Sequence, residues 1–176
     1  MTRVILGRAM NAEERRRFVE THRTCVFGYE RKNGPPSMSI VYYTMDGDDI
    51  LISTMVGRAK AKAVERTGRV SLCVLDEQWP PTYLVVYGKA KIESELEQTV
   101  RVMMKIGEIM AGKQLPEAAR PLVEQAAKKE ERVVVRISPE ETFCSPPVHL
   151  HRAEDAADSS TKLEHGYGAR LAWHAD

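Results

Sequence analysis

The chain has 176 residues, of which 43% are hydrophobic and 29% are charged, and its formal net charge is +1. This composition fits one globular domain with a hydrophobic core, and the near-zero charge argues against a general nucleic-acid-binding protein, which would carry a basic excess. No apolar run approaches the roughly 20 residues that span a bilayer, and we expect no secretory signal because the N-terminus lacks a long apolar core.

The N-terminal third is predicted to form a helix and three strands. Asn11 can cap a helix and Glu14 occupies the capping-box position, so a helix is expected to run to about Glu20. β-Branched and aromatic residues then predict three strands, which cover residues 24–31, 37–45 and 50–54. Tight turns at Asn33-Gly34 and Asp46-Gly47 are expected to join these strands into an antiparallel meander.

The remainder of the chain is predicted to add helices and three more strands. A short helix is expected from Ala59 to Arg66, with Gly68 as its C-terminal cap. Strands are predicted over residues 69–76, 83–92 and 132–137, and longer helices over residues 94–112 and 116–127. The methionines of the first longer helix are expected to fill the core. Six strands joined mostly by hairpins predict a mainly β fold with added helices, in the form of a closed or nearly closed antiparallel barrel.

The chain is predicted to divide into a barrel domain and a C-terminal extension. Residues 1–143 would form the barrel, with a helical insertion at about 95–127. Residues 144–176 would form the extension, whose small polar segment at 154–161 is typical of a mobile stretch. The aromatic residues between 166 and 173 are expected to dock either on the body of the chain or on a partner chain.

The turn between the third strand and the short helix carries a candidate anion site. Ser53 and Thr54 end the strand, and Gly57 makes the turn. The cations in or near the first helical turn are Arg58, Lys60 and Lys62. The positive end of the helix dipole disfavours cations there, and a bound phosphate would remove this conflict. The alternative is that these residues are solvated surface charges.

Other candidate groups carry weaker signals. His149 and His151 lack a matching cluster of ligands, so no metal site is expected. His22 is predicted to cap or pack against the first helix. Tyr42 and Tyr43 point to opposite faces of one strand, so one is expected in the core, while the other is a weak candidate for a catalytic group facing a groove; alternatively, both only pack. The three cysteines are far apart and odd in number, which favours free thiols in a reducing cytoplasm.

An ordered set of short motifs connects the chain to a known group of proteins. The motifs are Asn33-Gly34-Pro35, Val41-Tyr42-Tyr43, Asp46-Gly47-Asp48, Ser53-Thr54, Gly57-Arg58-Ala59-Lys60, Arg69-Val70-Ser71-Leu72 and Gln78-Trp79-Pro80-Pro81. They resemble the split β-barrel flavin- and deazaflavin-binding proteins of the pyridoxamine 5′-phosphate oxidase-like superfamily, and most closely the branch that uses coenzyme F420. The resemblance covers about residues 12–93. The chain departs from the family pattern at Ala63-Val64, where an Asn-Leu pair is frequent.

The resemblance implies a six-stranded split barrel that forms a homodimer, with the cofactor in a groove between the subunits. Arg58 and Lys60 would hold the cofactor phosphate. The second-strand backbone would lie along the tricyclic ring, at Met38, Ser39, Ile40 and Val41. Trp79 and Pro80 would line the groove.

Taken together, the residues and the resemblance favour a cytoplasmic, homodimeric oxidoreductase that passes a hydride from reduced F420 to a small unsaturated substrate. Ser53 and Thr54 would add hydroxyl contacts, and Lys62 would reach the acidic tail of the cofactor. The absence of an evident acid–base pair agrees with hydride transfer, in which the cofactor carries the chemistry. One alternative is the same fold with FMN, and another is a non-catalytic protein that binds or carries F420. No nucleic acid, membrane or metal is expected as a partner.

Overall fold

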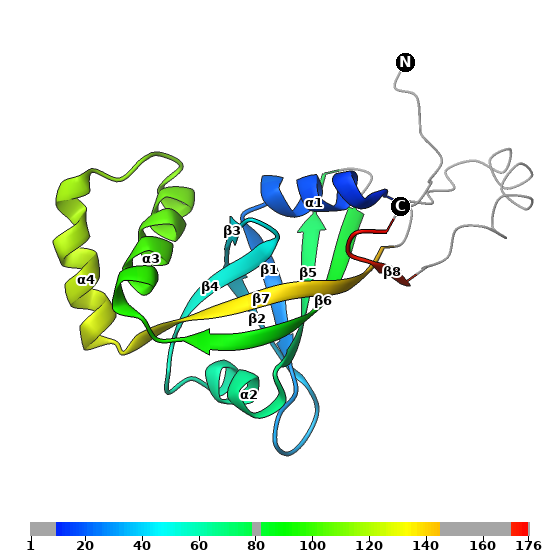
Figure 1. Ribbon diagram of the computed structural model, residues 1–176, viewed down its shortest axis with the longest axis horizontal. Helices are drawn as coiled ribbons and strands as arrows, with labels where there is room; N and C mark the ends of the chain where they lie inside the picture. Colours follow the sequence, from blue (N-terminus) through cyan, green and yellow to red (C-terminus); the bar gives the residue numbers. More distant parts are fainter. Residues whose placement is uncertain (1–9, 79–81, 145–169, 176) are drawn as a thin grey trace, which may run out of the picture.

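The computed structural model describes residues 10–78, 82–144 and 170–175, which form a curled antiparallel sheet with helices around it (Figure 1). The helices are α1 (Ala12–Thr21), α2 (Ala59–Thr67), α3 (Leu96–Ala111), the 3-10 turn η1 (Glu117–Ala119) and α4 (Arg120–Lys129). The strands are β1 (Thr24–Tyr29), β2 (Ser37–Tyr42), β3 (Thr44–Asp46), β4 (Asp49–Met55), β5 (Arg69–Asp76), β6 (Thr82–Glu93), β7 (Arg132–Phe143) and β8 (Arg170–Ala172). None of the described helices combines the length and the hydrophobicity needed to cross a bilayer.

The sheet is an open half-barrel whose two end strands follow each other in the chain. Its order is β2-β1-β5-β6-β7-β4-β3, with β8 added to β7. Only Tyr43 separates β2 from β3, so the strand predicted over 37–45 is bent there into two strands that pair at opposite ends of the sheet. The prediction of six strands was wrong, because the described residues form eight. The meander is confirmed only in part, since β1 pairs with β2 and β3 pairs with β4, but the other neighbour of β4 is β7 and not β2.

The main core fills the inside of the curled sheet. Alternate residues of the strands point inward, and the buried ones include Phe27, Ile52, Leu72, Leu84 and Ile137. Helix α1 lies across one end of the sheet, and α2 lies at the other (Figure 1). The capping box predicted for α1 is confirmed, since the Asn11 side chain accepts a hydrogen bond from the Glu14 backbone and the Glu14 side chain accepts one from the Asn11 backbone.

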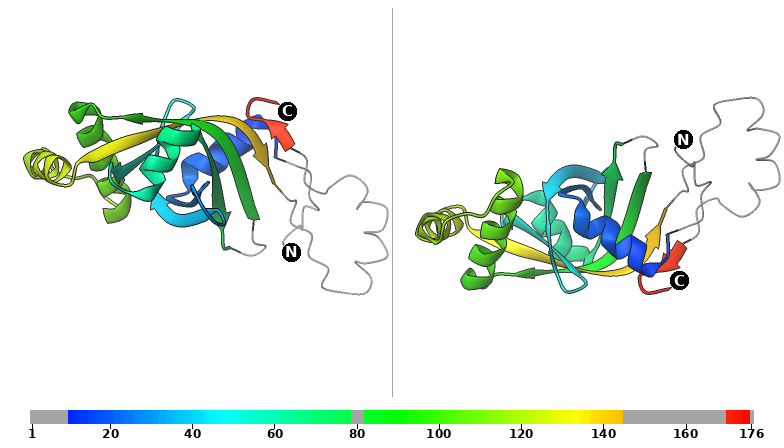
Figure 2. Two further views of the ribbon diagram at one scale, coloured as in Figure 1. Left: turned by 90° about the horizontal axis from the view of Figure 1, so that it is seen from below. Right: turned by 90° about the horizontal axis from the view of Figure 1, so that it is seen from above.

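A helical hairpin of α3 and α4 projects from one end of the sheet (Figure 2). It leaves the sheet after β6 and returns at β7, where Glu93 and Val134 are paired in the ladder. Val102 and Ile106 of α3 cover Leu51 and Val134 on the outer face of the sheet, in a second, smaller core. The expectation that the α3 methionines fill the core was wrong for Met110, whose residue surface is 57% exposed, because aliphatic residues take the core-facing positions.

The described part of the C-terminal extension docks on its own chain. β8 pairs antiparallel with the end of β7, and the Trp173 side chain is buried in the main core. Arg15 of α1 is fully buried beneath it and donates hydrogen bonds to the carbonyl groups of Ala172, Trp173 and Ala175. A fourth acceptor is the Met10 carbonyl, 2.7 Å from Nη1. A buried arginine therefore holds the end of the chain against the first helix.

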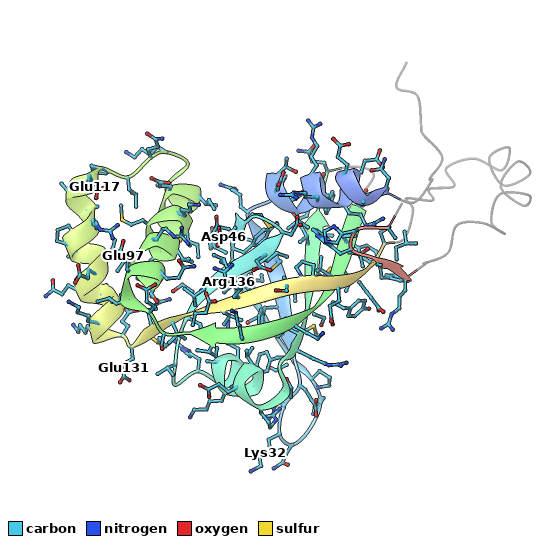
Figure 3. The ribbon with its side chains drawn as sticks, in the orientation of Figure 1. Lys32, Asp46, Glu97, Glu117, Glu131 and Arg136 are labelled. Atoms are coloured by element: carbon cyan, nitrogen blue, oxygen red, sulfur yellow. The ribbon has the colours of Figure 1, made fainter. Side chains whose placement is uncertain are left out.

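Arg136 on β7 ties its own strand to three others, β3, β4 and β6, on the outer face of the sheet (Figure 3). Each of its guanidinium nitrogens lies 2.9 Å from a different carboxylate, those of Asp46, Asp49 and Glu93. The hydrogen bond from Arg136 lowers the pKa of the Asp46 carboxyl below its ordinary value. The contribution of this contact to the free energy of unfolding is therefore complete at pH values above the pKa of the carboxyl in the unfolded chain, about 3.9. It is lost as the pH falls through the lower pKa of Asp46 in the folded protein.

We expect Arg136→Met to lower the free energy of unfolding at pH 7 by about 1 kcal/mol, since solvent partly screens the three ion pairs. The difference in the free energy of unfolding between the variant and the wild type should narrow as the pH falls below about 4, because protonated carboxyls carry no negative charge to pair with the guanidinium. Urea unfolding at neutral and acid pH measures this change. Lys89→Met, which removes an exposed ion pair with Glu140, is the control. A difference for Arg136→Met that stays constant across the pH range would contradict the expectation.

Candidate functional site

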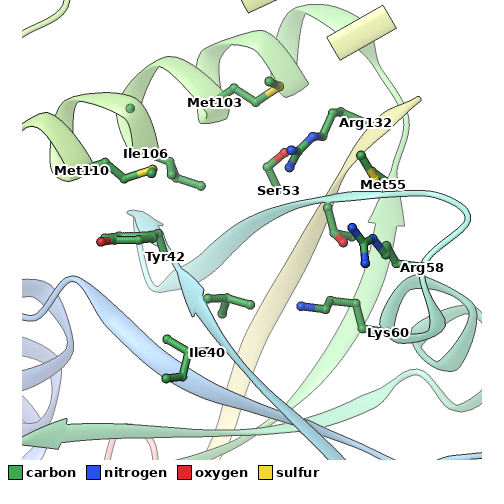
Figure 4. Close-up of a pocket in the computed structure, with 13 residues that line it drawn as sticks. Ile40, Tyr42, Ser53, Met55, Arg58, Lys60, Met103, Ile106, Met110 and Arg132 are labelled. Atoms are coloured by element: carbon green, nitrogen blue, oxygen red, sulfur yellow. The ribbon is translucent and has the colours of Figure 1, made fainter. Parts of the chain in front are cut away.

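A cavity of about 540 Å³ lies where β2, the end of β4, the start of α2 and the α3 helix meet (Figure 4). This volume is within the range of sites that bind a cofactor or a small molecule. Polar and charged residues gather at one end, which is lined by Ser53, Thr54, Arg58, Lys60 and Arg132. The other end is apolar and is lined by Ile40, Tyr42, Met103, Ile106 and Met110.

The cationic end is built by the turn from β4 into α2. β4 ends at Met55, whose carbonyl accepts a hydrogen bond from the Arg58 backbone N–H at 3.1 Å, and α2 begins at Ala59. Arg58 is the N-cap residue, has no side-chain capping bond, and is followed by no acidic residue in the first turn. The helix ends as predicted at Gly68, which has the left-handed φ of 62° and donates to the Val64 carbonyl.

The cations at the start of α2 lie close enough to repel each other. Among the described residues, no carboxylate forms an ion pair with Arg58 or Lys60. Burial lowers the pKa of Lys60, and the nearby positive charge of Arg58 lowers it further. The Lys60 ammonium also lies 5.8 Å from the centre of the Phe27 ring, on the inner side of the sheet. A bound anion would relieve both the charge repulsion and the unfavourable end of the helix dipole.

Two hydroxyl groups share the cavity with these cations, and one of them lacks a hydrogen-bond partner among the described residues. Ser53 lines the cavity, and its Oγ is buried without a hydrogen-bond partner among the described residues. Thr54 is buried beside it at the end of β4. A buried hydroxyl without a partner is costly, and ligand-binding sites are where such groups are expected.

Arg132 is a third cation of the cavity that the sequence did not indicate. It begins β7 and pairs with Met55 in the β4–β7 ladder, which brings it beside the α2 turn. Its Nε donates to Glu130 at 2.7 Å, so its charge is partly neutralised. The Val56 N–H donates to the carbonyl of Glu131, a residue with φ of 50°, and this bond joins the two turns. No local motif marks Arg132, because only the long-range strand pairing places it here.

The structure brings together half of the residues predicted to bind the cofactor. Six of them line the cavity: Ile40, Val41, Ser53, Thr54, Arg58 and Lys60. Met38 and Lys62 are exposed outside it, and Ser39 and Gly57 do not line it either. A Cβ at Gly57 would meet no atom within 4 Å, so this turn does not sterically require glycine. Trp79 and Pro80 lie outside the described residues.

The two tyrosines lie in different environments, one in the core and one at the cavity. Tyr43 is buried and donates its hydroxyl to the Val19 carbonyl at 2.6 Å, and burial raises the pKa of this hydroxyl. Tyr42 lines the cavity and remains the candidate to face a ligand. His22 caps α1, as predicted, with Nδ1 2.6 Å from the Phe18 carbonyl oxygen. The described residues contain no metal-binding cluster, and His149 and His151 lie outside them.

Comparisons with known proteins agree with this architecture. The family profile "Pyridoxamine 5'-phosphate oxidase" matches residues 12–144. A conserved hypothetical protein from Mycobacterium tuberculosis has a similar structure, with 24% identity, a TM-score of 0.71, and coverage of 87% of this chain and 97% of the other. An F420 reductase aligns at 20% identity and a TM-score of 0.57, over 72% and 93% of the two chains. A FAD-binding protein from Mesorhizobium loti aligns at 18% identity and a TM-score of 0.58, over 77% and 94%. No curated protein matches the sequence.

Proposed function

Because the chain belongs to the pyridoxamine 5′-phosphate oxidase family, we propose that it binds a phosphorylated flavin-type cofactor in this cavity and acts as an oxidoreductase. The observation that carries the proposal is the pair of cations at the positive end of α2, Arg58 and Lys60, which have no ion-pair partner in the described part of the chain. They lie at one end of a cavity whose other end is apolar. This division suits a ligand with a phosphate at one end and a flat ring system at the other.

The residues present fit such a cofactor, which supplies hydride chemistry when bound. Arg58 offers a guanidinium fork to the phosphate, and Lys60 offers a point charge. The Ser53 hydroxyl, which has no partner among the residues that the structure describes, can complete its hydrogen bonding with a polar ligand atom. Thr54 adds a second hydroxyl to this end of the cavity. Tyr42, on the apolar side, is the candidate hydrogen-bond donor to the ring or the substrate.

We favour coenzyme F420 as the cofactor and a small unsaturated molecule as the substrate. The F420 reductase among the similar structures supports this choice, although its likeness concerns the fold. Arg132 and the exposed Lys62 provide further positive charge for an acidic cofactor tail. FMN is the alternative, because one phosphate alone would satisfy Arg58 and Lys60. A non-catalytic F420 carrier is the second alternative.

The deciding experiment is to titrate F420 and FMN side by side into the purified protein. Tighter binding of F420 supports F420 as the cofactor, and tighter binding of FMN would identify FMN as the cofactor instead. Binding of neither would refute it. Oxidation of reduced F420 on addition of an unsaturated acceptor then separates an enzyme from a carrier.

We also propose that the protein is a cytoplasmic homodimer with the cofactor near the subunit interface. Met38 and Ile40 on β2 are exposed by 71% and 76%, beside the cavity, and a second subunit would cover them. The free thiols of Cys25, Cys73 and Cys144 support a reducing compartment.

The expected result of sedimentation is a dimer that persists at micromolar concentration, as for an obligate interface. Met38→Lys should shift the protein towards the monomer, because it places a charge on the apolar patch. Leu122→Lys on α4 is the matched control, since Leu122 is also exposed, by 69%, but lies away from β2. A wild-type protein that sediments as a monomer would count against the dimer and the shared cofactor groove.

A further inference from the structure

The polar end of the cavity reaches both faces of β4, at the end where this strand turns into α2. Val134, on the neighbouring strand β7, belongs to the smaller core beneath α3, whereas Val135 belongs to the main core. Paired residues of an antiparallel ladder share one face of the sheet, and side chains alternate between the faces along each strand. Ser53, which pairs with Val134, and Arg132, two residues before Val134, therefore point to the α3 side of the sheet.

The cations of α2 lie on the other side of β4. Figure 4 shows Arg58 and Lys60 on the α2 side of this strand, and Ser53 and Arg132 between the strand and α3. The Lys60 ammonium lies 5.8 Å from the centre of the Phe27 ring, which belongs to the main core. The backbone of β4 thus separates two polar parts of one cavity. A phosphate held by Arg58 and Lys60 leaves the second part to another ligand group.

Arg132 has hydrogen-bond donors available on the α3 side. Its Nε donates to the Glu130 side chain at 2.7 Å, while Nη1 and Nη2 donate to no other described residue. No acidic residue is found among the described residues that line the cavity. The bond to Glu130 holds the guanidinium in place, and the two terminal nitrogens form the planar fork that matches a carboxylate.

The Ser53 hydroxyl is a second, independent indication of a ligand on this side of β4. Its Oγ is buried with no hydrogen-bond partner in the part of the chain that the structure describes. This cost is relieved when a ligand oxygen accepts a hydrogen bond from the hydroxyl. Met103 of α3 lines the cavity beside Ser53 and Arg132 (Figure 4), and an apolar neighbour strengthens charge-assisted hydrogen bonds.

We propose that Arg132 and Ser53 form a carboxylate-binding subsite between β4 and α3, separate from the phosphate site on the α2 side. Glu130 already neutralises part of the Arg132 charge, so a group with a single negative charge fits better than a second phosphate. The inference deepens the proposed function and rests on it for the occupant of the α2 side. The carboxylate can come from the acidic tail of F420 or from a small unsaturated carboxylic acid that serves as the substrate.

The test compares crotonate with crotonamide, which has the same shape without the charge. A ligand-observed NMR titration measures the binding of both to the full-length protein, alone and saturated with F420. We expect crotonate to bind the wild type about tenfold more tightly than crotonamide. Arg132→Gln should weaken crotonate binding about tenfold and leave crotonamide binding unchanged. Ser53→Ala should weaken crotonate binding about threefold and leave the melting temperature unchanged or slightly higher, because it removes a buried hydroxyl that has no partner among the described residues.

Two control variants test whether the effect is local. Arg120 also has one carboxylate partner, Glu97, and its side chain is 32% exposed against 29% for Arg132, but it does not line the cavity. Arg120→Gln should therefore leave crotonate binding unchanged. Arg58→Ala should change it by no more than about threefold, because the backbone of β4 lies between the two sites. Equal losses of crotonate binding in Arg58→Ala and Arg132→Gln would overturn the separation of the sites.

The source of the carboxylate follows from the cofactor titrations. If crotonate binds the F420-saturated protein and Arg132→Gln leaves F420 affinity unchanged, the carboxylate belongs to a substrate. If F420 displaces crotonate and Arg132→Gln weakens the binding of F420 but not of FMN, which has no carboxylate, it belongs to the cofactor tail. Equal binding of crotonate and crotonamide to the wild type, or unchanged crotonate binding in Arg132→Gln, would overturn the subsite. If neither F420 nor FMN binds but crotonate binding still depends on Arg132, the subsite stands and the proposed function fails.

Discussion

Arg58→Ala is expected to weaken the binding of F420, or of FMN if that is the cofactor, by roughly tenfold to a hundredfold. The guanidinium would donate charge-assisted hydrogen bonds to the phosphate, each worth about 1.5–3 kcal/mol, and 1.4 kcal/mol corresponds to a factor of ten. Lys60→Ala should have the same effect, somewhat smaller, because an ammonium group is a point charge and not a fork. Titration of both cofactors into each variant measures the change.

The stability of the ligand-free variants distinguishes a ligand-binding role from a structural one. Arg58 stands at the positive end of α2 with no carboxylate partner among the described residues, so its removal should leave the melting temperature unchanged or slightly higher. Arg66 provides a control on the same helix, since it lies in the last turn and donates to the Glu30 carbonyl at 2.6 Å. Arg66→Ala should lower stability slightly and leave cofactor affinity intact. If Arg58→Ala lowered the melting temperature and left the cofactor affinity unchanged, the proposed phosphate site would be refuted.

Arg15→Met is expected to destabilise the protein by roughly 3 kcal/mol. The substitution removes the guanidinium donor from the carbonyl groups of Ala172, Trp173 and Ala175. The Ala172 oxygen still accepts from the Ala175 N–H at 3.0 Å, and an unpaired buried acceptor costs about 1–3 kcal/mol. The relief from removing a buried charge offsets part of this cost. For a chain of this size, the melting temperature should fall by about 6–12 °C.

The fluorescence of Trp173 reports directly on whether Arg15→Met releases the C-terminal segment. It is 3% exposed, so its fluorescence should shift to longer wavelength when the C-terminal segment detaches. The measurement is made in a Trp79→Phe background, so that the emission comes from one tryptophan. Arg17→Ala, two positions away on the exposed side of α1, should change neither the emission nor the melting temperature. Native emission and melting in Arg15→Met would show that strand pairing alone holds β8 in place.

The elements that were predicted correctly are those determined by neighbouring residues. Asn11 and Glu14 form the expected capping box, and Gly68 ends α2 in the left-handed conformation. The strand at 69–76 was predicted with its observed limits, because its alternation of buried and less buried residues is regular. Hairpin turns and caps depend on a few consecutive residues, and their signals are therefore visible in the sequence.

The features that were missed depend on pairings between distant segments. The pairing of β4 with β7 places Arg132 in the cavity, and no local pattern predicts that ladder. The bend at Tyr43 also depends on a distant segment, since this residue leaves the strand to bury its ring and to donate a hydrogen bond to the Val19 carbonyl of α1. Arg15 has the sequence pattern of an exposed helical arginine, and its burial follows from the C-terminal segment that packs over it.

The paired positions of Glu93 and Val134 have a consequence for how relatives of this protein can diversify. The α3–α4 hairpin begins and ends at neighbouring points of one ladder, so a segment of different length could replace it without moving the strands that carry it. The entropy of closing such a loop grows only slowly with its length. The cations at the start of α2 belong to another part of the chain, so exchange of the hairpin would change the apolar end of the cavity and spare the anion site. Evolution, or a protein engineer, can therefore reshape the apolar end of the cavity by replacing a single contiguous segment, without disturbing the anion site.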